Sequence, residues 1–433
     1  MPVGFVNPKE KDLTGAERGI ASYFKHPMRK TFQRAGKVLT WLLRQLPKSV
    51  PHFTLHKLHN LKTRVHKAAN NLTTRYKDNT GIKIFCSDVK QMFTFLTHDG
   101  IRRALIWLFA QMRELKQYTI RGGINRTPRK RRKNIVTLVV ETGEIYWGQG
   151  NHESHLRNIA TGSPEDVITF TFDDLMSVVN TDLEYTYSTV GTTILKQKLG
   201  CPIGGNLSSF YANLYCAKQE YEFITRPTLN RKDRIHGIRQ IDDVILWVAY
   251  DTTSKASEIE AEKLLLEVHP NPNQTKTSNS TVCADGLTVK REPIKIYTKN
   301  AQRYFQTDFA GMRITGKLKP NQSTDFTCET LNKNWKHLKS TGKQKVAKYP
   351  PNISYIHDRI KNGVMIGSMI RMKTQNSTQN LLYKHIARNL YEMKAIGYKQ
   401  DLLEQTLLKL KKKPGWQHTA KTMLKFVRTV LYA

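Results

Sequence analysis

Residues 239–247 read RQIDDVILW, with an acidic pair between two apolar runs. The longer segment 238–250 predicts a β-hairpin that carries Asp242 and Asp243 at its tip. Two adjacent carboxylates inside an apolar hairpin repel each other, which costs stability unless a cation lies between them. Carboxylate oxygens are hard ligands that suit Mg²⁺. The pair is therefore a candidate metal site, although ordinary turn tips often contain such pairs.

A third carboxylate ends another apolar segment. Residues 82–88 read IKIFCSD, and their alternation predicts a half-buried strand that finishes at Asp88. Three carboxylates on two neighbouring strands can hold two Mg²⁺ ions about 3.5–4 Å apart, the geometry of in-line phosphoryl transfer. One ion would activate a 3′-hydroxyl and the other would neutralise a triphosphate and its leaving pyrophosphate. Mn²⁺ is a possible substitute for Mg²⁺.

The composition limits the class of protein and its partners. The chain has 433 residues, with 70 Lys+Arg against 35 Asp+Glu and a net charge of +35. Its apolar content of 39% excludes a disordered polycation, and its length allows two to four subdomains. The net charge is +12 over residues 1–80, +5 over 81–250 and +11 over 360–433. This pattern predicts nucleic acid as a partner, with a solubility device or a ribosome-associated protein as the alternative.

The five cysteines are scattered and show no CxxC spacing. They argue against a disulfide framework and a structural zinc site, and we expect Cys86 and Cys201 to be buried. No run of about 18 apolar residues occurs, so no membrane segment is predicted. The first 20 residues contain no apolar signal core. We therefore expect an intracellular protein, and composition does not decide between mitochondrion and nucleus.

The remaining pattern predicts a mixture of helices and strands. A basic loop at 119–134 contains seven Lys and Arg residues, which favours a solvated insertion over a specific nucleic-acid contact. The other expected elements are mainly helical segments over 12–75, a helix over 92–118, a helix over 173–190, an extended segment over 192–198, a glycine turn at 200–205 leading into a helix over 207–223, and basic helices beyond about 365 with an amphipathic one at 418–431.

Three segments occur in the order of motifs A, B and C of reverse transcriptases. They are SDVKQMF (87–93), QKLGCPIGGNLSSFYANLYCAKQE (197–220) and RQIDDVILW (239–247). The set most closely resembles the motifs of Penelope-like elements and their telomerase relatives. Residues 379–405, QNLLYKHIARNLYEMKAIGYKQDLLEQ, resemble the thumb of the same group. The resemblance covers about 85–433.

The resemblance implies an α+β right-hand polymerase with fingers, palm and thumb. The basic N-terminal fingers region would be 1–80, the palm 81–310 with an insertion at 119–165, and the helical basic thumb 311–433. The implied activity is that of an RNA-directed DNA polymerase, which extends a DNA or RNA primer with dNTPs on an RNA template. A ribonucleoprotein partner is a further possibility, and no membrane partner is expected.

The resemblance also assigns roles to individual residues. Asp88 and Asp242 would ligate both metal ions, Asp243 would assist, and the carbonyl of Val89 would complete one coordination sphere. Phe93 stands where this family places a steric gate, an aromatic ring that clashes with a ribose 2′-hydroxyl. The plain alternative is that Phe93 is a core aromatic residue, and both interpretations are compatible.

Four further residues are expected to contact the nucleotide. Gln197, Gly200 and Gly204 would bring the backbone close to the incoming nucleotide and the template base, whereas the alternative is a glycine turn that caps a helix. Lys276, in NQTKTSN, would act as a general acid for pyrophosphate, and its alternative is a solvated lysine.

The sequence also departs from the family pattern. Gln240 stands where the family usually has an aromatic residue, and no fingers motif binds the triphosphate convincingly; the only candidates are Lys62, Arg64 and Lys67. No GIY-YIG endonuclease pattern follows the thumb, as in endonuclease-deficient members and free-standing reverse-transcriptase-like genes of green-algal mitochondria. Three rivals stay open: a catalytically reduced RNA-binding or maturase factor, an RNA-dependent RNA polymerase (which Phe93 disfavours), and a structural protein of a ribonucleoprotein.

Overall fold

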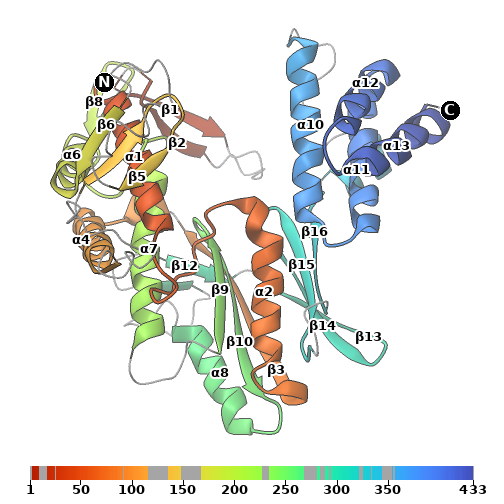
Figure 1. The fold of residues 1–433 in the computed structure, drawn as a ribbon, viewed down its shortest axis with the longest axis horizontal. Helices are drawn as coiled ribbons and strands as arrows, with labels where there is room; N and C mark the ends of the chain where they lie inside the picture. Colours follow the sequence, from red (N-terminus) through yellow and green to blue (C-terminus); the bar gives the residue numbers. More distant parts are fainter. Residues whose placement is uncertain are drawn as a thin grey trace, which may run out of the picture. The chain divides into compact units, whose positions relative to one another are not determined.

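The computed structural model describes residues 2–8, 17–24, 26–90, 92–115, 135–147, 167–226, 234–267, 280–282, 288–291, 294–320, 325–332, 334–343, 354 and 356–432. The chain divides into two compact units. Unit 1 comprises Met1–His56, Ser87–Val244 and Lys263–Glu292, and unit 2 comprises Lys57–Cys86, Ile245–Glu262 and Pro293–Ala433. The chain is of mixed α+β class (Figure 1). The division into fingers (1–80), palm (81–310) and thumb (311–433) expected from the sequence stays a prediction.

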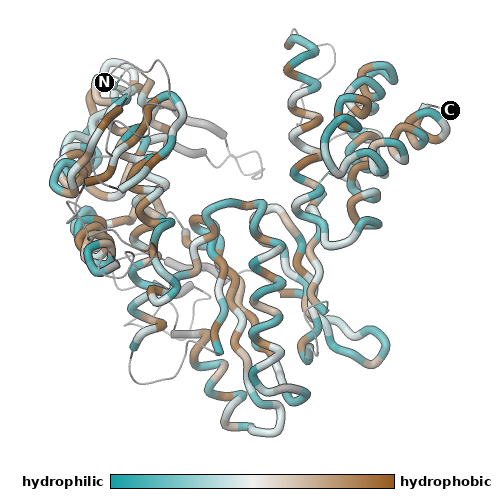
Figure 2. The backbone as a smooth tube through the Cα atoms, in the orientation of Figure 1, coloured by the Kyte–Doolittle hydropathy of each residue, from teal (hydrophilic) through white to brown (hydrophobic). Residues whose placement is uncertain are grey.

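A five-stranded sheet carries the acidic residues. Its strand order is β11-β12-β3-β10-β9. The strands are β3 (Thr80–Lys90), β9 (Ile235–Gln240), β10 (Asp243–Asp251), β11 (Ser280–Val282) and β12 (Thr288–Arg291). β10 is fully buried from residue 244 to 249, and Figure 2 shows it as hydrophobic along most of its length. The predicted strand over 82–88 and the hairpin over 238–250 are therefore confirmed.

Unit 1 contains a helical layer and two small sheets. Its helices are α1 (Arg29–Arg44), α3 (Met92–Phe95), α4 (His98–Leu115), α6 (Phe172–Glu184) and α7 (Ser208–Thr225). One sheet has the order β2-β1-β7-β8, with β1 (Val3–Pro8), β2 (Glu17–Ser22), β7 (Tyr187–Val190) and β8 (Thr193–Lys196). The other has the order β5-β4-β6, with β4 (Ile135–Val139), β5 (Ile145–Trp147) and β6 (Val167–Thr171).

Local sequence explains how these elements begin and pack. α1 buries Phe32, Val38 and Leu42 on one face, as its helical spacing of apolar residues requires. α6 begins with a capping box, in which the Thr171 hydroxyl accepts from the Asp174 N–H and the Asp174 carboxylate accepts from the Thr171 N–H. α4 packs against α7, and α1 packs against both α6 and α7.

Two of the expected helical segments contain strands. β2 lies within the segment 12–75, which was expected to be mainly helical. It is a strand because it pairs with β1 along its whole length. The helix expected over 173–190 ends at Glu184, and β7 follows it, pairing with both β1 and β8. Long-range pairing of this kind leaves little trace in a local pattern. The basic loop 119–134 lies outside the described residues, whereas the rest of the expected insertion includes β4 and β5.

Unit 2 combines an antiparallel sheet with a helical bundle. The sheet has the order β13-β14-β15-β16, with β13 (Lys295–Lys299), β14 (Gln302–Phe309), β15 (Met312–Lys317) and β16 (Phe326–Thr330). The helices are α2 (Leu61–Thr73), α9 (Trp335–Thr341), α10 (Asp358–Gln375), α11 (Gln379–Ala395), α12 (Gln400–Lys411) and α13 (Gln417–Phe426), which a π-helical turn over Val427–Leu431 extends. α8 (Lys255–Glu267) follows β10. Single 3₁₀ turns occupy Leu58–Asn60 and Lys77–Asn79.

The helices α10 to α13 share one methionine-rich core. It includes Met365, Met369, Met372, Met393 and Met423 together with leucines of α11 and α12. Flexible, unbranched methionine fills irregular gaps between helices that cross at different angles. The helical expectation beyond residue 365 is confirmed. In the described ranges, no helix has the length and apolar character needed to cross a bilayer.

Candidate metal centre

Strand β3 presents Asp88 at its C-terminal end. Ser87 and Val89 on either side are buried, with 2% and 3% of their surface exposed, while Asp88 is half-buried. Successive side chains of a strand point to opposite faces, so Asp88 projects away from the buried face. The Val89 N–H donates to the carbonyl oxygen of Asp242 at 3.0 Å. This hydrogen bond ties the end of β3 to the tip of the acidic hairpin.

The hairpin tip is a strained two-residue turn. β9 ends at Gln240 and β10 begins at Asp243, so Ile241 and Asp242 form the connection. Ile241 has φ = 59°, in the left-handed region that a β-branched residue strongly disfavours. Strain of this kind persists only where the surrounding structure enforces it. Its result is that both carboxylates lie at the tip.

The three carboxylates meet at one place. One oxygen each of Asp88, Asp242 and Asp243 lies within 4.8 Å of the other two, and all three residues are half-buried. Three partly desolvated like charges at this separation repel each other, and a divalent cation with oxygen ligands fits such a donor set. The structure thus brings the three predicted residues together. Their role as metal ligands, and that of the Val89 carbonyl, stays a prediction.

A buried guanidinium lies behind the tip. Arg239 is 0% exposed and pairs with Glu220 of α7, which is 1% exposed. Its Nη1 donates to the carbonyl oxygen of Ile241 at 3.1 Å and to Oδ1 of Asn213 at 3.0 Å. Its Nη2 donates to Oγ1 of Thr54 at 2.7 Å. Arg239 therefore fixes the strained residue of the turn to helix α7 and to the segment around residue 54.

The backbone completes this network. The Phe53 N–H donates to Oε2 of Glu220 at 2.8 Å, so the second carboxylate oxygen is also satisfied. Burial opposes the charge of Arg239, but the nearby Glu220 carboxylate raises the pKa of the guanidinium, and Asp242 adds to this effect. Burial likewise raises the pKa of the Cys216 thiol to about 11, against the opposing charge of Arg239. Both groups keep a fixed charge state at neutral pH.

The glycine turn of the second motif packs on the segment that carries Phe93. Gly200 has φ = 76°, and a Cβ at this position would lie 2.3 Å from the Phe93 carbonyl oxygen. The same oxygen accepts from the Cys201 N–H at 2.7 Å, and the Gly200 N–H donates to the Leu96 carbonyl at 3.0 Å. His98 Nε2 lies 2.8 Å from the Gly200 carbonyl oxygen. Only glycine fits at position 200, and its close packing holds the backbone of half-buried Phe93.

The other predicted nucleotide contacts lie in different surroundings. Gly204 has φ = 103°, and a Cβ there would lie 2.6 Å from the carbonyl oxygen of Ala21 in β2. The Gln197 side chain donates to the carbonyl of Leu199 at 2.9 Å. Lys276 lies outside the described residues. The nucleotide-binding roles of all three stay predictions.

The triphosphate candidates Lys62, Arg64 and Lys67 lie on α2 in unit 2, whereas the acidic cluster belongs to unit 1. Among them, the Lys62 ammonium donates to the carbonyl oxygen of Asn376 at 3.2 Å. This contact gives Lys62 a structural role at the end of α10.

Besides Glu220, unit 1 contains a second buried carboxylate, Asp182, that the sequence analysis did not identify. Asp182 of α6 is 4% exposed and accepts from the Tyr211 hydroxyl of α7 at 2.8 Å. Burial raises the pKa of Asp182 to about 6, although the Tyr211 hydrogen bond opposes the shift. Burial and the Asp182 charge also raise the pKa of Tyr23. As expected, Cys86 and Cys201 are buried.

The local sequence gives no clear signal for the missed residues. Glu220 lies in AKQEYE (217–222) and Asp182 in NTDLE (180–184), so each has polar or charged neighbours like those of an exposed position. Their burial depends on partners from other elements. The identity of the partner is not readable, because Arg239 and Glu220 come from different elements.

Searches for relatives gave structural similarity alone. No family model and no curated protein matches the chain. Among solved structures, apo telomerase from Candida tropicalis has a TM-score of 0.48 and 11% sequence identity, covering 99% of this chain and 62% of that one. Telomerase from Candida albicans with a TWJ fragment of telomeric RNA has a TM-score of 0.45 and 12% identity, covering 99% of this chain and 66% of that one. The chain thus spans about three fifths to two thirds of these telomerases' length, and this level of similarity does not assign it to a family.

Proposed function

We propose that this chain is an RNA-directed DNA polymerase that extends a primer 3′-end with dNTPs on an RNA template. The observation that carries the proposal is the meeting of Asp88, Asp242 and Asp243 within 4.8 Å, at the end of β3 and the tip of the β9–β10 hairpin of one sheet. In the proposed right-hand layout the five-stranded sheet is the palm. The motif resemblance, rather than composition, supplies the reaction class.

Asp88, Asp242 and Asp243 would hold two Mg²⁺ ions in this proposal. When bound, such ions supply Lewis-acid activation of the primer 3′-hydroxyl and neutralise the triphosphate. The protein holds the ligands in place before the ions arrive. The hydrogen bond from Val89 to Asp242 joins β3 to the hairpin, and the contact of Arg239 with Ile241 holds the hairpin turn. A site fixed in this way loses little free energy to reorganisation during reaction.

Selection of dNTPs is assigned to Phe93. Its carbonyl accepts from the Cys201 N–H and lies against Gly200, so the backbone that carries the ring is held five residues beyond Asp88. A rigid aromatic ring excludes a ribose 2′-hydroxyl by sterics, whereas RNA-dependent RNA polymerases need a hydrogen-bonding side chain there. The proposal therefore predicts strong discrimination against rNTPs.

The net charge of +35 supports a template-primer duplex as the bound partner. Lys and Arg contacts to phosphates are independent of sequence and weaken as salt rises. Recognition of an A-form hybrid by its backbone fits this composition, because its deep major groove hides the base edges from side chains.

The test is primer extension on a poly(rA)/oligo(dT) hybrid with Mg²⁺, comparing dNTPs with rNTPs. The wild-type chain is expected to extend with dNTPs, and Asp242→Asn is expected to lose about 10³-fold or more of the rate. A matched control is Asp308→Asn, a carboxylate of unit 2 that pairs with Arg313 and should leave the rate unchanged.

Other outcomes would redirect the assignment. Extension with rNTPs alone would replace the proposal with an RNA-dependent RNA polymerase. Tight, salt-sensitive RNA binding without extension, equal in wild type and Asp242→Asn, would mean a fold kept for RNA recognition and would reject the polymerase.

A further inference from the structure

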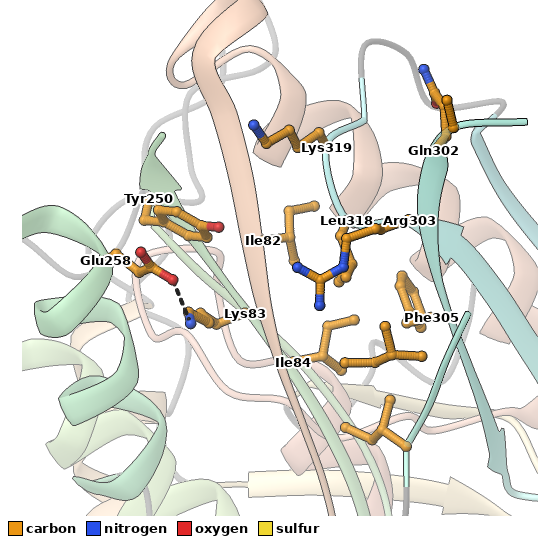
Figure 3. A pocket seen from close by; sticks show the side chains of 13 residues that line it. Ile82, Lys83, Ile84, Tyr250, Glu258, Gln302, Arg303, Phe305, Leu318 and Lys319 are labelled. Carbon is orange, nitrogen blue, oxygen red and sulfur yellow. Dashed lines mark ion pairs between the residues drawn. The ribbon is translucent and has the colours of Figure 1, made fainter. Parts of the chain in front are cut away.

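A cavity of about 460 Å³ lies within unit 2. Its lining comes from the first half of β3, from β10, from α8 and from the hairpin β13–β14 (Figure 3). None of the three clustered carboxylates lines it. The cavity is therefore distinct from the candidate metal centre, and its binding properties can be measured without metal or catalysis.

Backbone hydrogen bonds hold the walls together. The Ile82 N–H donates to the carbonyl of Leu318 at 3.0 Å, and the Leu318 N–H donates to the carbonyl of Arg303 at 2.9 Å. Tyr250 lies against Gly81, where a Cβ would be 2.4 Å from its ring. The cavity is thus preformed, and its aromatic wall has a fixed position.

The charges in the lining do not balance. Lys83 pairs with Glu258 at 2.7 Å, so this cation is already neutralised. Arg303 and Lys319 are exposed, and neither forms an ion pair with any residue in the described part of the chain. Figure 3 shows the Arg303 side chain reaching from β14 into the cavity, and its charge is felt at the Tyr250 hydroxyl. The cavity therefore offers two uncompensated positive charges.

The rest of the lining is apolar. Ile84 and Ile294 are half-buried apolar residues of the lining. Inorganic phosphate would satisfy the two cations and leave this apolar wall in contact with water. A neutral apolar ligand would cover the wall and leave the two cations unmatched. A ligand that carries both a phosphate and a flat aromatic group matches the lining, because such pockets combine apolar surface with a few charged anchors.

We propose that this cavity binds one nucleotide, with its phosphate on Arg303 and Lys319 and its base against Tyr250 and the apolar wall. Stacking on an aromatic ring tolerates any base, and a guanidinium binds phosphate in a planar, bidentate manner. The nucleotide is either a free mononucleotide or one residue of a nucleic-acid strand. The two sources share this chemistry and are separated by experiment.

The experiment measures two affinities of the full chain in EDTA, which removes any metal-dependent nucleotide binding. Equilibrium dialysis reports adenosine 5′-monophosphate, and fluorescence anisotropy reports a labelled five-nucleotide oligouridylate. The variant Arg303→Gln/Lys319→Gln is expected to weaken binding at least about tenfold, because two charge-assisted contacts to phosphate are lost.

The control removes the same charge from the same hairpin. Lys295 and Lys299 of β13 are exposed and lie outside the lining, so Lys295→Gln/Lys299→Gln is expected to weaken binding less than about twofold. A second variant, Ile296→Asp, places a carboxylate in the lining at a position that is 52% exposed and should tolerate it. It is expected to abolish binding by repelling phosphate.

Each outcome decides the proposal. Loss of both probes in the lining variants alone supports a site open to free nucleotides, and loss of oligouridylate alone supports a nucleotide bound within a strand. Equal weakening in the lining and control pairs would reduce the effect to general surface charge and overturn the proposal. Binding of dodecanoate with no binding of either nucleotide probe would also overturn it, in favour of an acyl ligand.

Discussion

Unit 1 places its carboxylates in two contrasting environments. Glu220 is buried and both of its oxygens are satisfied, one by Arg239 and the other by the Phe53 N–H. Asp88, Asp242 and Asp243 are half-buried and lie within 4.8 Å of one another. The protein itself neutralises Glu220, whereas the three aspartates bring their carboxylates together at one place.

The two environments indicate different roles for Glu220 and for the three aspartates. A buried, fully bonded ion pair adds little net stability compared with apolar residues, but it fixes geometry. Arg239 uses that rigidity to hold Ile241 in a disfavoured conformation at the hairpin tip. In the proposed function, a bound cation would offset the repulsion among the three aspartates.

Glu220→Ala is expected to cost about 3–5 kcal/mol in the free energy of unfolding. It leaves the Arg239 guanidinium uncompensated in a fully buried position and also orphans the Phe53 N–H. Urea denaturation of the wild type and the variant measures the difference. Glu222→Ala is the matched control on the same helix: it removes the partially exposed partner of Lys218 and should cost less than about 1 kcal/mol.

A double variant sharpens this comparison. If Glu220→Leu/Arg239→Met costs much less than the sum of the two single changes, the pair is a coupled unit whose main role is to position the turn. Additive costs would contradict that role. Loss of primer extension in the double variant, at nearly unchanged stability, would assign the network to the site.

Local sequence patterns predicted which carboxylates come together, and the reason is physical. Strand alternation around Asp88 and the apolar runs flanking Asp242 depend on neighbours in sequence, so both are visible in the chain. The contact between Gly200 and the Phe93 carbonyl joins segments about 100 residues apart, and the sequence indicates only that a glycine turn is present. Likewise, β2 and β7 form because they pair with β1, and no local signal marks that partner.

Gly200→Ala is expected to cost about 3 kcal/mol, since φ = 76° disfavours any side chain and the new Cβ would meet two carbonyl oxygens within 2.4 Å. The strain displaces Phe93, so discrimination between dNTPs and rNTPs should fall together with stability. Thermal unfolding and the ratio of extension rates report the two effects.

The control for this change is Gly363→Ala in α10, where no atom lies within 4 Å of an added Cβ. Alanine has the higher helix propensity, so this variant should gain about 0.5–1 kcal/mol. Equal destabilisation by both alanines would show that Gly200 is not under special steric constraint.

The buried Asp182 carboxyl is expected to make stability depend on pH between about 4 and 6. Burial raises its pKa from the ordinary 3.8 to about 6, so the folded state holds this proton to higher pH than the unfolded state does. Its contribution is complete below about pH 4 and is lost as pH rises through 6, by about 2–3 kcal/mol. Denaturation of the wild type against Asp182→Asn, from pH 4 to pH 7, measures it. A difference between the two proteins that stays constant with pH would contradict this account.

Glu329 in unit 2 should show the opposite and smaller dependence. A hydrogen bond from His385 and the charge of Lys384 lower the pKa of Glu329 to about 2, against the effect of burial. The stability it provides is complete above about pH 4.5 and is lost as the pH falls toward 2. Because solvent screens a half-buried group, the expected loss is only about 1 kcal/mol between pH 5 and pH 3. Glu329→Gln should remove this loss and leave the Asp182 dependence intact. If both variants altered stability over the same pH range, the two carboxylates could not have pKa values shifted in opposite directions. The physical distinction between burial without a cation and burial beside one would then fail for this protein.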